Sequence, residues 1–244
     1  MSALGHYIGE EGIATVAISL IRPQTENTKP PRALWVPFEL GRPFGPPSDP
    51  AFQKRVILAA LRLLEREDGP VLIEDFPPED DPRAQPDPAW QPPFIPAAVS
   101  AGPAETLASR LETEILLLTD AHEHWIGQHG RTTVGLSGLS VSDCARYVAD
   151  WLHGRVPPSL RDGFSAPLML RFAVDDVKAY CLEAAAAGPA KPSSRQLGDW
   201  FWSGTGAGAA IHALRAAQLA SEDDRLKLIA GNFMVPAARV HGSG

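Results

Sequence analysis

The sequence predicts an α/β unit with a small, largely parallel sheet, followed by a mainly α-helical module. Before residue 76, short β-branched runs alternate with a helical pattern, an arrangement typical of parallel sheets. After residue 102, apolar residues recur mainly at helical spacing. Ten of the 24 prolines lie from Pro70 to Pro103. We therefore expect an α/β unit over 1–76, a proline-rich strap over 77–101 and a helical module over 102–244.

Three strands are expected in the α/β unit. Residues 12–21 (GIATVAISLI) are apolar on both alternating faces, which suits a strand covered on both sides. Residues 32–37 and 71–73 give the other two strands, separated by an amphipathic helix that begins at Ser48-Asp49-Pro50. Residues 2–11 suffice for only about two helical turns. We therefore expect that the chain begins inside an α/β fold and takes part of its cover from another polypeptide.

The strap should be extended and ordered. Proline fixes φ and removes a backbone donor, so regular structure is disfavoured from Pro77 to about Ala101. Trp90, Phe94 and Ile95 are apolar enough to bind this segment to a surface of its own chain or of a neighbour.

The module after the strap contains five helical patterns and one expected short strand, at 132–137. The helices are expected over 103–128, 140–153, 167–187, 193–219 and 222–232. Ser193 and Gln196 have the spacing of a capping box, in which each side chain bonds the other residue's backbone N–H.

Composition restricts the classes of partner. The chain has 29 acidic and 22 basic residues and a formal charge of −7, which disfavours a nucleic-acid partner. The apolar stretch 13–21 is too short for a bilayer span and lacks the features of a signal peptide. Cys144 and Cys181 are far apart and form no CxxC pair. We expect a soluble cytoplasmic protein without a membrane partner.

Residues 7–66 resemble part of a known family. The segments EEGIATVAISLIRP, PPRALWVPFELGRPFGPPSDPAF and QKRVILAALRLLE read as a buried strand, a second strand with a proline-rich turn, and an amphipathic helix. This order resembles the C-terminal part of the substrate-specific B subunits of glycine, sarcosine and betaine reductases and of the related proline reductase subunit. The family's proline–histidine–proline–leucine–glycine turn corresponds to Pro37–Gly41, where Glu39 or its neighbour replaces the histidine.

The resemblance implies a reductase-like activity on a small amino-acid-like or N-substituted substrate. The family carries a selenocysteine or cysteine nucleophile just upstream of this segment, whereas this chain has no cysteine before Cys144. We therefore expect a hetero-oligomer in which a companion polypeptide provides the thiol or selenol and this chain completes the substrate pocket.

The candidate pocket residues follow the first two strands. Ligands of open α/β sheets bind at the carboxyl ends of the strands. Arg22 and Arg42 are expected to hold a substrate carboxylate, with Thr25 beside them, and Glu39 is expected to act as an acid or base. In the alternative interpretation, Glu39 and the arginines pair with each other and brace a proline-rich loop.

A second candidate site lies on the first helix after the strap. Glu114 and His122 are expected on one helix face, and His129 lies seven residues beyond His122. A carboxylate with two histidines can hold iron, manganese or zinc, although neither HExxH nor a paired ExxH is present. The glycine-rich stretch 204–208 follows no strand and is better explained by close helix contact or a kink, so no cofactor is evident.

Three functions stay open at this point. The leading one is a subunit of a reductase-like heteromer that completes the substrate pocket. The second is a non-catalytic subunit that stabilises such a companion. The third is a metal-dependent enzyme that uses the Glu114/His122 helix face.

Overall fold

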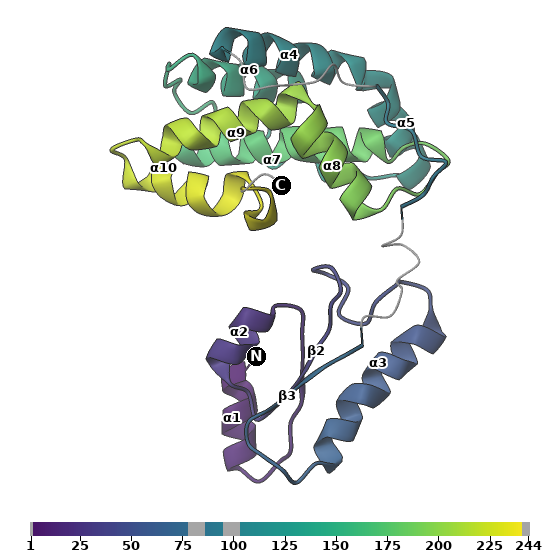
Figure 1. The fold of residues 1–244 in the computed structure, drawn as a ribbon. Helices are drawn as coiled ribbons and strands as arrows, with labels where there is room; N and C mark the ends of the chain where they lie inside the picture. Colours follow the sequence, from purple (N-terminus) through teal and green to yellow (C-terminus); the bar gives the residue numbers. More distant parts are fainter. Residues whose placement is uncertain (1, 78–85, 95–102, 241–244) are drawn as a thin grey trace. The chain divides into compact units, whose positions relative to one another are not determined.

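The chain forms two compact units, residues 1–85 and 86–244, which we describe separately (Figure 1). The structure is a computed structural model that describes residues 2–77, 86–94 and 103–240. The boundary lies after Gln85, inside the predicted strap.

The first unit contains a three-stranded parallel sheet in the order β1-β2-β3, as predicted. Ala17 lies opposite Ala33, and Ala33 lies opposite Ile73. The elements in chain order are α1 (Ser2–Glu10), β1 (Ala17–Ser19), α2 (Arg22–Thr28), β2 (Arg32–Trp35), α3 (Pro50–Arg62), η1 (Leu63–Glu65) and β3 (Leu72–Asp75).

Both faces of this sheet are covered by helices of the same chain. Figure 1 shows α1 and α2 on one side of the strands and α3 on the other. Leu34 of β2 packs with Phe52 and Val56 of α3 in one apolar cluster. On the opposite face, the Thr15 hydroxyl donates to the Gly5 carbonyl of α1 at 3.2 Å. α1 and α2 thus lie beside β1, whose three residues stay half-buried. The expectation that another polypeptide adds cover to the first strand stays a prediction.

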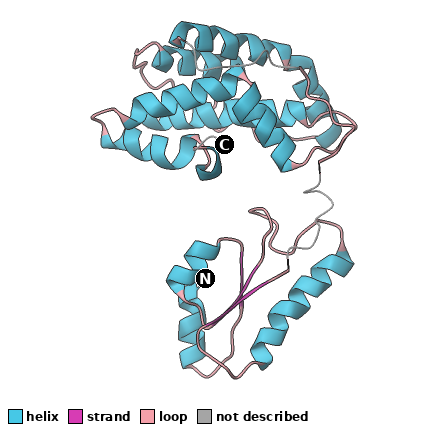
Figure 2. Cartoon of the chain, in the orientation of Figure 1, coloured by secondary structure: helices cyan, strands magenta, loops and turns pink. Residues whose placement is uncertain are grey.

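The second unit is mainly helical (Figure 2), as predicted. Its core surrounds α7, whose Met169, Leu170 and Ala173 are fully buried. No helix in the described part of the chain is both long and apolar enough to cross a membrane. The elements are α4 (Ala104–Leu117), α5 (Thr119–His129), α6 (Val141–Leu152), α7 (Ala166–Ala185), α8 (Ser194–Gly204), α9 (Gly206–Leu219), α10 (Asp224–Ile229), η2 (Ala230–Met234) and η3 (Ala237–Arg239).

Three details of this unit differ from the prediction. The helix expected over 103–128 is interrupted at Leu118, between α4 and α5. The helix expected over 193–219 is interrupted at Thr205, whose backbone is extended and whose hydroxyl caps α9 by accepting from the Gly208 N–H at 2.9 Å. Residues 132–137 form an irregular loop rather than a strand, because side chains of α7 bind its backbone, as shown below.

The described part of the strap lies against its own helical unit. The indole N–H of Trp90 donates to the Ala185 carbonyl at 3.0 Å. The Phe94 ring packs edge-on to the Trp200 ring, with centroids 5.5 Å apart. Residues 86–94 therefore make the surface contacts expected of a strap. Ile95 and the rest of the strap from 78 to 85 and from 95 to 101 lie outside the described residues.

Candidate functional site

The carboxyl ends of the three strands bring together one arginine, one tryptophan and one aspartate. Arg22 begins α2 directly after β1, Trp35 is the last residue of β2 and Asp75 is the last residue of β3. The Arg22 guanidinium forms an ion pair with Asp75, and its Cζ lies 5.6 Å from the centroid of the Trp35 ring. We refer to Arg22, Trp35 and Asp75 as the carboxyl-edge cluster.

The cluster holds a cation that solvent can reach. The hydrogen bond that Arg22 donates to Asp75 raises the pKa of Arg22, so the guanidinium stays charged. Its Nε also lies 3.0 Å from a carboxylate oxygen of Glu26, one helical turn further along α2. The side chains of Arg22 and Asp75 are 39% and 51% exposed. An accessible cation and an accessible anion therefore lie side by side next to an aromatic ring.

Thr25, predicted to line the site, is buried instead. Its hydroxyl donates to the carbonyl of Ile21 at 2.9 Å and also contacts the Ser19 hydroxyl. These bonds attach the first turn of α2 to the end of β1. The Thr25 hydroxyl is thus bound within the chain.

Glu39 and Arg42 pair with each other. Oε2 of Glu39 lies 3.5 Å from Nη1 of Arg42, with both side chains partly exposed. The backbone N–H of Arg42 also donates to the Glu39 carbonyl at 3.0 Å. This geometry is the one that the bracing alternative predicts for the turn after β2.

Glu114 is directed at the start of another helix. Its two carboxylate oxygens accept from the backbone N–H groups of Gly206 and Ala207, at 2.6 and 2.9 Å. Burial raises the pKa of Glu114, and these two bonds act in the opposite direction. Its acceptor oxygens thus satisfy the first N–H groups of α9.

His122 and His129 have different surroundings from Glu114 and from each other. His122 Nε2 lies 2.9 Å from a carboxylate oxygen of Glu183, and its ring centroid lies 4.3 Å from that of Tyr180. His129 stacks on Trp125 with centroids 3.6 Å apart. The interruption at Leu118 turns α5 away from α4, so these candidate ligands do not converge. Within the described ranges, no group of three His, Cys, Asp or Glu side chains is placed to hold a metal ion.

Sequence reasoning missed two buried carboxylates of α7. Fully buried Asp176 accepts from the backbone N–H groups of Gly135, Leu136 and Ser137, at 2.8–2.9 Å. Glu183 accepts from the Thr133 N–H at 2.7 Å. The sequence did contain a signal for these two residues. Two acidic residues lie seven positions apart, and therefore on one face, in a helix whose other buried residues are mostly apolar. Their role here is to hold the loop at 132–137.

Neither thiol of the chain is available as a nucleophile. Cys144 and Cys181 are both buried. Burial raises the pKa of Cys144 to about 11 and also raises the pKa of Cys181. Both thiols therefore stay protonated at neutral pH, and a thiolate is the reactive form.

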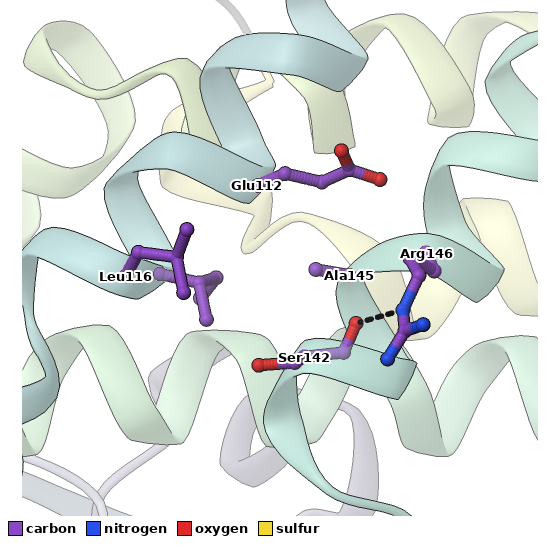
Figure 3. A pocket seen from close by; sticks show the side chains of 6 residues that line it. Glu112, Leu116, Ser142, Ala145 and Arg146 are labelled. Carbon is purple, nitrogen blue, oxygen red and sulfur yellow. Dashed lines mark hydrogen bonds between the residues drawn. The ribbon is translucent and has the colours of Figure 1, made fainter.

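A small hollow lies between α4 and α6 (Figure 3). It has a volume of about 240 Å³. Its lining contains no thiol and no histidine, so it offers a contact surface without evident chemistry. The lining residues are Glu112, Ile115, Leu116, Ser142, Ala145 and Arg146.

Comparison with known protein families, curated proteins and solved structures found no match to this chain. The resemblance of residues 7–66 to reductase B subunits therefore remains a hypothesis.

Proposed function

We propose that this chain is a subunit of a cytoplasmic, reductase-like heteromeric enzyme that acts on a small amino-acid-like or N-substituted substrate. In this proposal the chain completes the substrate pocket at the carboxyl-edge cluster. A companion protein provides the thiol or selenol that the reductive step requires.

The observation that carries the proposal is the pairing of Arg22 with Asp75 beside Trp35. A small amino acid offers a carboxylate and an ammonium group a few ångströms apart. An arginine can bind the carboxylate in a bidentate manner, and an aspartate can accept from the ammonium. The Trp35 ring lies beside the guanidinium that would make the first contact. The position at the carboxyl ends of parallel strands agrees with where open α/β sheets bind ligands.

The state of the cysteines supports a companion as the source of the nucleophile. Reductive cleavage by a thiol begins with an accessible thiolate or selenolate, and Cys144 and Cys181 are buried with raised pKa values. Two free, unpaired cysteines also agree with a reducing compartment.

The test begins with isolation of the native assembly and identification of its members. We expect a companion that carries a reactive cysteine or selenocysteine. The purified assembly should then reduce at least one of glycine, sarcosine, betaine and proline in the presence of a dithiol. Replacement of Arg22 by glutamine should lower kcat/KM by roughly ten- to a hundred-fold, the effect of losing a charge-assisted contact. Arg62→Gln, on α3, is the matched control and should leave kcat/KM unchanged.

A non-catalytic stabilising subunit is the second candidate, favoured by the way Arg22 and Arg42 already pair with carboxylates of this chain. It predicts that Arg22→Gln lowers the melting temperature of the assembly and leaves kcat/KM unchanged. A companion without cysteine or selenocysteine would contradict the reductase proposal itself.

A further inference from the structure

We infer that the outer edge of β1 is a docking edge, to which the companion protein adds an extended, uncharged strand followed or preceded by a basic residue. This inference rests on the proposed function, because it names the surface through which the companion binds.

β1 lies at one end of the sheet. β1 pairs with β2 on one side only, within the part of the chain that the structure describes. The Ser19 carbonyl accepts from the Val36 N–H at 2.8 Å, so the peptide groups of Ser19 face β2. Peptide groups alternate along a strand, and those of Ile18, the middle residue of β1, therefore face outward. They offer one donor and one acceptor to which another strand can bind.

The two edges of the sheet differ in composition. Natural edge strands are usually protected against pairing by charged residues or prolines. The β3 edge has both: Glu74 and Asp75 in the strand, and Pro70 and Pro77 around it. Residues 12–21 contain neither a charged residue nor a proline. The β1 edge thus has neither charge nor proline, and only the shortness of this three-residue strand limits pairing there.

Apolar surface and two hollows lie near the segment that leads into β1. Ile13, four residues before β1, is 61% exposed. Two neighbouring hollows, of about 520 and 150 Å³, lie between α1 and the amino ends of the strands. Both are lined in part by Thr15 and Pro31, and the larger one also by residues 69–71 before β3. The segment that flanks an added strand at this end of the sheet can reach them.

Charge selects the kind of partner. Exposed Glu10 and Glu11 directly precede the uncharged segment, so a basic residue at the matching end of the added strand is favoured. A second copy, paired about a two-fold axis, would place its own Arg22 end beside these glutamates. That end includes the carboxylates of Glu26 and Asp75 and has one more negative than positive charge. Self-pairing is therefore disfavoured, and a different chain is the expected occupant.

Amide hydrogen exchange tests the docking edge directly. The full chain is compared with the native assembly, and exchange is resolved for single amides of β1. The outward-facing amide of Ile18 should exchange at least about ten-fold more slowly in the assembly. The amide of Ser19, which faces β2, should change much less. An equal exchange rate of the Ile18 amide in both samples would overturn the inference. Protection of this amide that increases with the concentration of the isolated chain would also overturn it, because it would show that a second copy binds the edge.

A charged substitution at the edge gives a second test. Ile13→Lys should weaken binding of the full chain to the purified companion by at least about ten-fold. Leu228→Lys, at a similarly exposed leucine of α10, should change the Kd by less than about two-fold. Equal effects of the two variants would contradict the docking edge.

These outcomes separate the inference from the proposed function. A companion that protects Ile18 but has no cysteine or selenocysteine would support the edge and contradict the reductase proposal. A companion with such a nucleophile that leaves Ile18 unprotected would contradict the edge alone.

Discussion

Glu114 of α4 satisfies the first two backbone N–H groups of α9, those of Gly206 and Ala207, at 2.6 and 2.9 Å. The contact is close: a Cβ atom added to Gly206 would lie 2.7 Å from Cβ of Arg110 and 3.1 Å from Glu114. Glycine at 206 and a carboxylate at 114 are therefore parts of one junction. This junction explains why the glycine-rich stretch 204–208 lies at the start of a helix inside the bundle. The stretch does not form a phosphate-binding loop.

Glu114→Ala should lower the free energy of unfolding by about 2–4 kcal/mol, because two buried N–H groups lose their acceptor. Glu114→Gln keeps one acceptor oxygen and should cost about 1 kcal/mol. Urea denaturation of the full chain measures both values. Glu112→Ala, at an exposed position on the same helix, is the control and should have little effect. Equal destabilisation by Glu112→Ala and Glu114→Ala would contradict the junction.

Glu183 should make stability depend on pH. Burial acts to raise its pKa, but hydrogen bonds from Thr132, Thr133 and His122 outweigh it, so the pKa of Glu183 is lowered. The unfolded chain therefore binds this proton at a higher pH than the folded chain does. The stabilisation by Glu183 is present above the ordinary carboxyl range and is lost as pH falls through it to the lower folded pKa.

Glu183→Gln should accordingly lower the free energy of unfolding at pH 7 by about 1–3 kcal/mol, and its difference from the parent should narrow as pH falls below about 4. Denaturation curves at several pH values provide the measurement. Glu123→Gln, at an exposed residue beside His122, should show no such convergence. A Glu183→Gln penalty that grows on acidification would have the wrong sign.

Local sequence patterns predicted the caps of the helices correctly. The Asp49 side chain accepts from the Phe52 N–H, and Ser193 with Gln196 forms the capping box. Each involves residues three positions apart, so the pattern contains the whole interaction. In contrast, α2 was missed because its sequence, RPQTENT, has no apolar periodicity. Its position depends on tertiary contacts at the end of β1.

Non-local contacts also limited prediction of the site. Arg22 was predicted because it follows a strand, but its partner Asp75 lies 53 residues away. The interruption of the helix at Thr205 depends on Glu114, which lies 92 positions from Gly206. Sequence spacing cannot predict such pairs, because the two residues meet only when the strands and helices pack together.

The cysteines should be unreactive and dispensable for turnover. Because both are buried and the pKa of Cys144 is raised to about 11, the folded chain should react with a thiol reagent much more slowly than the unfolded chain. Joint replacement of Cys144 and Cys181 by alanine should leave turnover of the assembly within about three-fold of the parent. Loss of activity in a double variant that still folds and assembles would place a nucleophile in this chain.

The Glu39–Arg42 pair should contribute to stability rather than to chemistry. The two side chains are partly exposed and 3.5 Å apart, and such ion pairs contribute less than about 1 kcal/mol to folding. Glu39→Gln and Arg42→Gln should each lower the melting temperature slightly and leave kcat/KM of the complete assembly unchanged. Direct contact with substrate would instead cost roughly ten- to a hundred-fold in kcat/KM.

The two variants together distinguish a brace from two separate substrate contacts. If the residues act only on each other, the double variant should be no less stable than the less stable single variant. Kinetics and melting of the two single variants and the double variant, measured beside Arg22→Gln, complete the comparison. If Glu39→Gln lowers kcat/KM but leaves the melting temperature unchanged, Glu39 acts as an acid or base and is not only a brace. In that case the substrate pocket would extend from the carboxyl-edge cluster to the turn after β2.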